Sequence, residues 1–373
     1  MLLPNDDWYQ VRNIDEVDSP ALVVFPERVK NNIRLAIDMV GDVRRLRPHV
    51  KTNKSPQAVQ MMLDEGIRKF KCATIAEAEI LGQCKAEDVL LAYQPLGPKL
   101  DRFIQLIRKF PLTAFSCLTD SIEAAKEQSE AFCRHRLKVA VYIDVNVGMN
   151  RTGIVPGKEL IDLYSYCYKT GGMSIKGLHV YDGHIRDNDI AERTENCNRA
   201  FELIEETKNE LTKAGLPPPE IIAGGSPTFP VHALRRGVEC SPGTFIYWDK
   251  GYSDLCPEQA FKPAAVLVTR IISLPAKNTI CTDLGHKSVA AENSIDRRVF
   301  FLNADGLKPV GQSEEHLVVE NTGTKIYKAG DVLYALPYHI CPTVALYERV
   351  FTAKQGMVNG EWKNVGRDRK LEI

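Results

Sequence analysis

The stretch KVAVYIDVN at residues 138–146, followed by GKELIDLYSYCYKT at residues 157–170, contains the repeating unit that decides the fold. The first stretch is an almost continuous apolar run, as expected of a parallel β-strand that is buried on both faces. The second has the mixed apolar and polar pattern of an amphipathic helix. Together the two stretches predict one strand–helix unit of a parallel α/β fold.

The same alternation extends in both directions, from about residue 20 to residue 245. The apolar runs that precede or follow a helical stretch are ALVVF (21–25), KFKCAT (69–74), DVLLAY (88–93), TAFSCL (113–118), KVAVYIDVN (138–146), MSIKGLHVY (173–181) and PEIIAGG (219–225). Seven or eight such units favour a (β/α)8 barrel of the TIM type over an open doubly wound sheet. No G-x-G-x-x-G motif lies at a strand–helix junction, which argues against a dinucleotide-binding fold.

The pattern changes after about residue 257. The segments there are β-rich, with turns between them and no long helix, for example AAVLVTRIISLP, EEHLVVEN and DVLYALPYH. Such a series predicts a separate all-β domain. We therefore predict a (β/α)8 barrel over residues 20–250 and a β domain made of residues 1–19 together with residues 251–373.

Composition and charge narrow the class of protein. The 373 residues carry 48 basic and 48 acidic side chains, so the formal net charge is zero and a non-specific nucleic-acid binder is not expected. The first residues, MLLPNDDWYQ, do not have the pattern of a secretory signal, and no apolar stretch approaches the roughly 18 residues of a membrane span. Ten cysteines without a C-x-x-C pair are typical of a reduced, cytoplasmic protein. We expect a cytoplasmic protein that binds a small molecule rather than a nucleic acid or a membrane.

Polar and glycine-rich motifs follow the predicted strands at the points where the strands end. They are RPHVK (47–51), AYQP (92–95), DVNVGMNRTG (144–153), HVYDGH (179–184), AGGSPTF (223–229) and ECSPGTF (239–245). In a barrel of this kind the active site is built at the carboxyl ends of the strands. The sequence therefore predicts a single site to which all these segments contribute.

Two glycine-containing loops near the end of the barrel have the features of a phosphate site. Gly224 and Gly225 allow backbone N–H groups to approach a ligand closely, and Ser226 adds a hydroxyl donor at the start of a short helix. Gly243 and Thr244 lie in a second small-residue loop one strand later, where such barrels often bind phosphate. A tight strand-to-helix turn is the alternative for the first loop taken alone.

The basic run RRLRPHVKTNKS at residues 44–55 contains two lysines, Lys51 and Lys54, three residues apart. Three interpretations are open: ordinary solvated charge, a basic binding patch, or one lysine with a chemical role. The zero net charge makes the patch the weakest of the three.

Four further candidates come from two other strand ends. Arg151, in VGMNRTGI, lies between glycines that would let the backbone approach a flat or anionic group, although a surface arginine in a turn is the simpler alternative. In HVYDGH, alternation places His179 and Tyr181 on one face and His184 beyond them in the loop. A structural hydrogen-bonding role is the alternative for each histidine.

The motif PYHICPT at residues 337–343 offers a metal pair in the β domain. His339 and Cys341, two residues apart on a predicted strand, would point to the same face. An imidazole with a thiolate is a borderline-soft donor pair that favours zinc. Two ligands leave the shell open, as a catalytic metal requires, while a packed pair in the core remains the alternative.

These motifs resemble those of the fold-type III enzymes that use pyridoxal 5′-phosphate, the alanine racemase-like group. VGMNRTGI is similar to the G-M-x-R-x-G segment of that group. RPHVKTNK is similar to the R-P-H-x-K-T-H-K signature of its D-threonine aldolase and D-serine dehydratase family, and PYHICPT matches the H-x-C/D-P metal motif of the same family. The resemblance covers nearly the whole chain.

The resemblance implies roles for the candidate residues. Lys51, the first of the two lysines, would bind the cofactor covalently, and the surrounding positive charge would lower its pKa and keep it nucleophilic. Arg151 would contact the phenolic oxygen of the cofactor, and Tyr181 would also lie against the cofactor. The phosphate would be bound by the two loops already described, at Gly224, Gly225, Ser226, Gly243 and Thr244.

A divalent metal on His339 and Cys341, zinc or else manganese or magnesium, would bind the β-hydroxyl of the substrate, and His184 would serve as the base. One position departs from the family pattern: Asn53 stands where the signature has a histidine. Since an amide cannot carry a proton charge, an acid–base role for this position is in doubt.

The activity implied by the resemblance is that of a lyase acting on D-3-hydroxy amino acids. The aldolase reaction, which breaks the Cα–Cβ bond to give glycine and an aldehyde, is favoured over a dehydratase reaction that gives a 2-oxo acid and ammonia. An amino-acid racemase is a second alternative, which would need a second base and no metal. A non-catalytic carrier of the cofactor is a third, against which the β domain argues. The resemblance also implies a homodimer.

Overall fold

The computed structural model describes residues 7–373 and divides into two compact units. The first, which we call the β unit, contains the chain up to Ile33, Thr52–Gln57 and Thr244–Arg367. The second, the barrel unit, contains Arg34–Lys51, Ala58–Gly243 and Asp368–Ile373. Both units are therefore discontinuous in sequence, and the chain passes between them several times. Residues 1–6 of the predicted β domain lie outside the described part of the chain.

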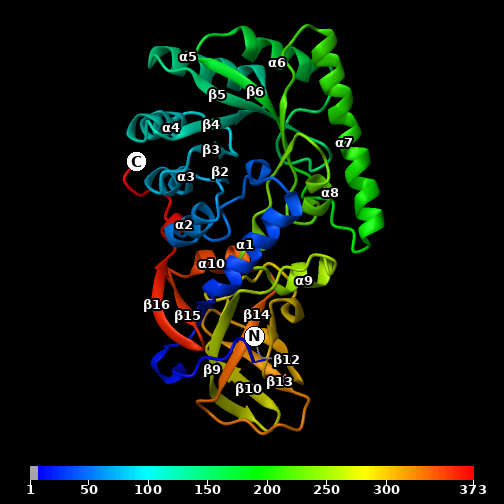
Figure 1. Ribbon diagram of the computed structural model, residues 1–373. Helices are drawn as coiled ribbons and strands as arrows, with labels where there is room; N and C mark the ends of the chain where they lie inside the picture. The colour runs from blue at the N-terminus through cyan, green and yellow to red at the C-terminus, as the bar shows by residue number, and fades with distance from the viewer. Residues whose placement is uncertain (1–6) are drawn as a thin grey trace. The chain divides into compact units, whose positions relative to one another are not determined.

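The barrel unit is built on seven parallel strands that follow one another in sequence order across the sheet (Figure 1). They are β2 (Lys69–Cys72), β3 (Asp88–Leu91), β4 (Ala114–Thr119), β5 (Val139–Val145), β6 (Met173–Val180), β7 (Glu220–Ala223) and β8 (Val238–Cys240). Most of their residues are buried, which explains why the strands are continuous apolar runs in the sequence.

Residues 46–49 close this sheet into a ring. Leu46 forms a parallel bridge with Cys240 at the end of β8, and His49 forms one with Lys71 in β2. The segment therefore occupies the eighth strand position, although it is too irregular to form a full strand. The buried guanidinium of Arg47 adds side-chain bonds to Glu239 at 2.7 Å and to Asp88 at 2.6 Å. The predicted barrel followed by a β domain is thus confirmed, with seven regular strands in the barrel.

Helices connect consecutive barrel strands. They are α2 (Pro56–Asp64), α3 (Ile75–Gln83), α4 (Pro98–Lys109), α5 (Ile122–Arg134), α6 (Lys158–Lys169), the long α7 (Ile190–Lys213) and the short α8 (Phe229–Ala233). Several begin at a capping residue: the side chains of Thr74, Ser121 and Asp189 each accept a hydrogen bond from a backbone N–H in the first turn. Helix α1 (Pro26–Val40) begins in the β unit and ends in the barrel unit.

The interpretation of ALVVF as the first barrel strand was wrong. Strand β1 (Ala21–Val24) pairs antiparallel with β9 (Ala265–Ala276) and parallel with β15 (Arg349–Lys354), both in the β unit. All four residues of β1 are buried. A strand in the middle of any sheet with two covered faces has the same apolar pattern, so the pattern could not identify its partners.

The β unit contains a mostly antiparallel sheet of nine strands in the described chain, with the order β12-β13-β10-β9-β1-β15-β16 and with β14 pairing both β9 and β11. The remaining strands are β10 (Thr279–Thr282), β11 (Val299–Phe301), β12 (Leu307–Gln312), β13 (Leu317–Asn321), β14 (Val332–Pro337) and β16 (Met357–Lys363). The β unit also contains two short helices, α9 (Lys250–Leu255) and α10 (Ile340–Leu346). Tyr9, Val11 and Val17 pack into its core without forming a strand.

Candidate active site

The carboxyl ends of the barrel strands surround a cavity of about 730 Å³ within the barrel unit. Its walls are formed by His49, Lys51, Lys71, Ala73, Thr74, Ala92, Tyr93, Gln94, Leu96, Leu118, Asp120, Asp144, Arg151, Thr152, His179, Tyr181 and Arg369. Three predicted cofactor residues, Lys51, Arg151 and Tyr181, are among them. The cavity lies where an active site is expected in a barrel of parallel strands.

Lys51 reaches this cavity because it directly follows the segment that closes the ring. Backbone bonds from His49 to Pro242 and from Val50 to Lys71, both 2.9 Å, hold that segment in place. The Lys51 side chain is half-buried at the cavity wall. The neighbouring Asn53 is buried and its side-chain oxygen accepts a hydrogen bond from the Ser55 backbone, so it stabilises a turn.

The Tyr181 ring lies close to both Arg151 and the first glycine loop. The guanidinium of Arg151 lies 5.0 Å from the centre of the Tyr181 ring. A Cβ atom on Gly225 would be 3.2 Å from the same ring, and Gly224 has a φ of +85° with no room for a side chain against His232. The two glycines are therefore required by close packing, and their N–H groups donate within the protein, that of Gly224 to the Val180 oxygen at 2.9 Å and that of Gly225 to the Thr228 hydroxyl at 3.2 Å.

A buried hydrogen-bond network formed by Asp182, Thr228 and His232 fixes the glycine loop. The Asp182 carboxylate, directly after Tyr181, accepts bonds from the Thr228 hydroxyl and from His232 Nε2, each at 2.7 Å, and Thr228 in turn accepts from the Gly225 N–H. Burial opposes the charge on Asp182, but the interactions with His232 and Thr228 prevail and lower its pKa. With Cys197 nearby, Asp182 and His232 also form a group of donors that could hold a metal ion. We predicted none of these residues from the sequence.

The second loop meets the first through Ser226. Its buried hydroxyl accepts a 3.4 Å bond from the Gly243 N–H. Thr244, the next residue, is buried and begins a short 3₁₀ turn in the β unit.

Asp144, His179 and Lys71, which line the cavity and which we call the cavity floor, lie in contact with one another. From the sequence we had named only His179 as a candidate. His179 Nδ1 lies 2.7 Å from Asp144, and His179 Nε2 lies 3.4 Å from the Lys71 amine. Because burial and the nearby charge of Lys51 disfavour its ammonium form, the pKa of Lys71 falls to about 7. Burial and the charge of Lys71 likewise lower the pKa of His179. The available signal was Lys71, a lysine between two apolar residues, Phe70 and Cys72, in the buried part of β2.

His184 does not line this cavity. It is exposed and borders a different depression together with Val147, Ile185 and Asp187, and its ring lies against Gly148. The loop after β6 carries it outward, whereas His179 lies within the strand and faces the barrel interior. The histidines that line the cavity are His49 and His179, so the structure does not bring His184 to it, and the role of His184 as the base stays a prediction.

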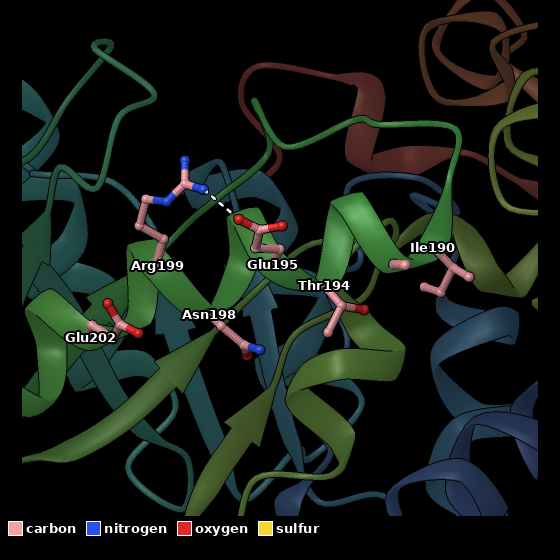
Figure 2. Close-up of a pocket in the computed structure, with 7 residues that line it drawn as sticks. Ile190, Thr194, Glu195, Asn198, Arg199 and Glu202 are labelled. Carbon is pink, nitrogen blue, oxygen red and sulfur yellow. Dashed lines mark hydrogen bonds and ion pairs between the residues drawn. The ribbon is translucent and has the colours of Figure 1, made fainter.

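A further hollow of about 660 Å³ runs along the exposed side of α7 (Figure 2). Its lining residues, including Thr194, Asn198 and Glu202, come from this one helix, and Arg199 pairs with Glu195 at 2.8 Å. Such a pair one turn apart is common on a solvated helix. None of the predicted cofactor residues lines this hollow.

The predicted metal pair lies at a strand–helix junction and not on a strand. His339 is the residue that precedes α10, and Cys341 is in its first turn. Within the β unit, Cys341 Sγ is 3.0 Å from the Thr52 hydroxyl, and His339 Nδ1 pairs with Glu292. A carboxylate on Nδ1 is the usual outer partner of a metal-binding histidine and leaves Nε2 as the atom that would bind the ion. The donors therefore fit a divalent metal.

The protonation of this pair depends on its surroundings. Burial lowers the pKa of His339, but hydrogen bonds with Cys341 and Glu292 outweigh burial and raise it to about 9. A metal would displace this proton, as binding to imidazole and thiol donors generally does.

Comparisons with known proteins agree with this arrangement. Residues 25–251 match the alanine racemase N-terminal domain, and residues 264–353 match the model of a serine dehydratase domain. A D-threonine aldolase from Arthrobacter sp. is 26% identical over 358 residues, which are 93% of this chain and 92% of that protein. A D-threo-3-hydroxyaspartate dehydratase from Delftia sp. (strain HT23) is 28% identical over 251 residues, 62% of each chain. The crystal structure of a D-threonine aldolase from Filomicrobium marinum has a TM-score of 0.86 at 23% identity, covering 94% of this chain and 96% of that one.

A parallel barrel with a lysine, an arginine and a glycine loop at its strand ends, joined to a β domain with a metal motif, defines a class of pyridoxal phosphate enzymes. The chain belongs to the alanine racemase-like family of these enzymes, in the group that contains the D-threonine aldolases and D-serine dehydratases. Members of this group are metal-activated lyases. No helix in residues 7–373 combines the length and the apolar character needed to cross a membrane.

Proposed function

We propose that this protein is a lyase, dependent on pyridoxal phosphate and a divalent metal, that cleaves D-3-hydroxy amino acids. Its reaction is the retro-aldol cleavage of the Cα–Cβ bond to glycine and an aldehyde, as in D-threonine aldolases. The observation that carries the proposal is the cavity that brings Lys51, Arg151 and Tyr181 together beside the glycine loop. The similarity to a D-threonine aldolase over nearly the full length of both chains favours this reaction.

The residues fit the cofactor in size and charge. Lys51 supplies the amine that binds it, and Arg151 is available for its phenolic oxygen. The loop from Gly224 to Ser226 remains our candidate for its phosphate, with the Ser226 hydroxyl as the side-chain donor, because the N–H groups of Gly224 and Gly225 already donate to Val180 and Thr228. The bound cofactor would supply the electron sink that weakens the bonds at the α-carbon.

The metal would be held by His339 and Cys341. Zinc is the ion that this imidazole and thiolate pair favours, with manganese as an alternative. A divalent ion there would act as a Lewis acid toward the β-hydroxyl of the substrate. Glu292 would orient the His339 ring by accepting from its Nδ1–H.

Proton handling falls to the groups on the cavity floor in this proposal. Asp144 accepts from His179 Nδ1, so His179 is held in the tautomer whose Nε2 lone pair faces Lys71. Both His179 and Lys71 have lowered pKa values, so both can exist in the neutral form that accepts a proton near pH 7. In our proposal His179 and Lys71 therefore replace His184 as candidates for the base.

A dehydratase reaction on the same substrates is the alternative. It would release a 2-oxo acid and ammonia, with Lys51 taking the α-proton. Cys341 favours it, because we associate a cysteine at this metal position with the dehydratases. The similarity to a D-threo-3-hydroxyaspartate dehydratase supports it as well. A racemase would leave the metal pair without a role.

Product analysis with D-threonine decides among these reactions. The purified protein is incubated with D-threonine, pyridoxal phosphate and zinc or manganese. Glycine and acetaldehyde are the products expected from the aldolase. 2-Oxobutanoate with ammonia would assign the chain to the dehydratases, and inversion at the α-carbon alone would assign it to the racemases. No reaction with any of several D-3-hydroxy amino acids would overturn the proposal.

A further inference from the structure

The walls of the active-site cavity carry more positive than negative charge. The cationic side chains are Lys51, Lys71, Arg151 and Arg369, and the carboxylates are Asp120 and Asp144. Both carboxylates are already engaged, Asp120 by the Gly153 N–H at 3.0 Å and Asp144 by His179 at 2.7 Å. The cavity is therefore suited to a ligand with several negative charges.

Arg369 comes from a segment far from the barrel in sequence. Residues 368–373 follow the whole β unit, yet they belong to the barrel unit. Glu79, a fully buried residue of α3, accepts hydrogen bonds from the backbone N–H groups of Glu372 at 3.4 Å and Ile373 at 3.3 Å. Lys109 of α4 pairs with the same carboxylate at 3.0 Å. A buried carboxylate persists only with such partners, so the docking of this segment is built into the barrel unit.

A second anchor fixes the other part of the segment. Arg102, also on α4, donates to the backbone oxygen of Arg369 at 3.0 Å and to that of Ile373 at 2.8 Å. The backbone of Arg369 is thus held against α4, and its side chain lines the cavity. The Arg369 guanidinium forms no hydrogen bond or ion pair with any residue in the part of the chain that the structure describes, residues 7–373.

The order of the strands places Arg369 away from the proposed phosphate loops. Helix α4 follows β3, whereas the glycine loop follows β7. In the ring formed by β2 to β8 and residues 46–49, β3 and β7 are four positions apart and so lie on opposite sides. The phosphate end of the cofactor and Arg369 would therefore be at opposite walls, which leaves Arg369 for the substrate.

We propose that Arg369 determines substrate specificity by binding a carboxylate on the substrate's side chain. A planar guanidinium pairs with a carboxylate through two parallel hydrogen bonds, which gives both strength and orientation. The preferred substrates are then D-3-hydroxy amino acids with an acidic side chain. This inference rests on the proposed function. The cofactor would occupy Lys51 and Arg151, and Lys71 is kept for proton transfer, so Arg369 is the cation of the cavity wall that is left for a carboxylate of the substrate.

The test compares D-threo-3-hydroxyaspartate with D-threonine. The β-carbon carries a carboxylate in the first and a methyl group in the second. Initial rates are measured for the wild-type holoenzyme and for Arg369→Gln and Lys370→Gln. Lys370 is the matched control, because it is a neighbouring cation of the same segment that does not line the cavity. For Arg369→Gln, we expect the KM of the dicarboxylate to rise at least about tenfold more than that of D-threonine, since a charge-assisted bond is lost. Lys370→Gln should change neither KM.

Equal effects of Arg369→Gln on both substrates, or none on either, would overturn the inference while leaving the lyase intact. Binding of D-aspartate and D-alanine, measured by calorimetry on the same holoenzymes, separates the two proposals, since neither amino acid carries a β-hydroxyl. Tighter binding of D-aspartate that disappears in Arg369→Gln supports the carboxylate site even if no hydroxy amino acid is cleaved. Indifference of D-aspartate binding to Arg369→Gln refutes the site.

Discussion

The Nε2 atom of His179 lies 3.4 Å from the amine of Lys71 on the floor of the cavity. Because Asp144 binds the other ring nitrogen, the ring presents a lone pair to Lys71, and the amine can donate to it. The imidazole cannot compensate a full ammonium charge as a carboxylate would. The protonated form of the buried Lys71 is therefore unfavourable in the folded protein. This makes the free energy of unfolding depend on pH.

The contribution of Lys71 to the stability of the cofactor-free protein should rise with pH between about 7 and 10.5, and it is measured as the difference between the wild type and Lys71→Met. An unfolded lysine keeps its proton up to its ordinary pKa of 10.5, whereas folded Lys71 loses it at about 7. The unfolded chain then binds more protons in this window, so unfolding becomes less favourable as pH increases. Lys71→Met should be more stable than the wild type at pH 7, by a few kcal/mol at most, since one pKa unit corresponds to about 1.4 kcal/mol.

Urea unfolding at several pH values measures this effect. The advantage of Lys71→Met should shrink toward pH 10. Lys138→Met serves as the control because Lys138 is exposed just before β5. A difference in stability between the wild type and Lys71→Met that stays constant across the window would contradict the lowered pKa of Lys71.

Replacement of Lys51 by alanine should abolish covalent attachment of the cofactor and reduce the rate by on the order of 10³-fold or more. Attachment is checked by borohydride reduction followed by mass spectrometry of the intact protein. Lys54→Gln is the matched control, because Lys54 does not line the cavity. If the reduced adduct were found on Lys54 instead, the assignment of the two lysines would be reversed.

Cys341→Ala should remove the bound metal, with a loss in affinity of at least about 100-fold, because one of two protein ligands disappears. Metal content per chain is measured after dialysis against a defined zinc concentration. Cys281→Ala tests for a general effect of cysteine loss, since Cys281 lies in β10 of the same unit and is also partly exposed. Retention of the full metal content by Cys341→Ala would contradict the proposed site.

Arg47→Met should destabilise the fold by about 2–4 kcal/mol, because it leaves the carboxylates of Asp88 and Glu239 without their buried partner. The loss should also weaken cofactor retention, since Arg47 fixes the segment that leads to Lys51. Chemical denaturation measures the first effect. The exposed Arg44→Met, which breaks a pair with Asp42 on the surface, is expected to cause no measurable change.

Much of the barrel was predictable because its signals are local. Alternating buried strands and amphipathic helices leave a pattern in every unit, and the glycine loops, Lys51 and Arg151 each lie in a segment that follows a barrel strand or the bridge-forming residues 46–49. Such positions converge in any closed parallel barrel. Lys51, Arg151 and Tyr181 therefore lie at one cavity in the structure, as expected from their places in the sequence.

The errors concern partners that are distant in the sequence. The run ALVVF has the composition of a buried strand, but its neighbours β9 and β15 lie more than two hundred residues away. His339 and Cys341 were expected on a strand, because the two-residue spacing gives no sign that a helix starts between them. Choosing between His179 and His184 required knowing where β6 ends relative to the cavity.

The sequence by itself determined the two architectures and placed Lys51 and the His339–Cys341 motif among the candidate site residues, since periodicity and short motifs depend only on neighbouring residues. Only the tertiary structure decided which sheet receives β1, that Lys71, His179 and Asp144 share one floor, and that Arg369 reaches the cavity. These outcomes depend on strand pairing and on buried polar contacts between segments far apart in the chain. A carboxylate such as Glu79 selects its partners only once folding has removed it from water.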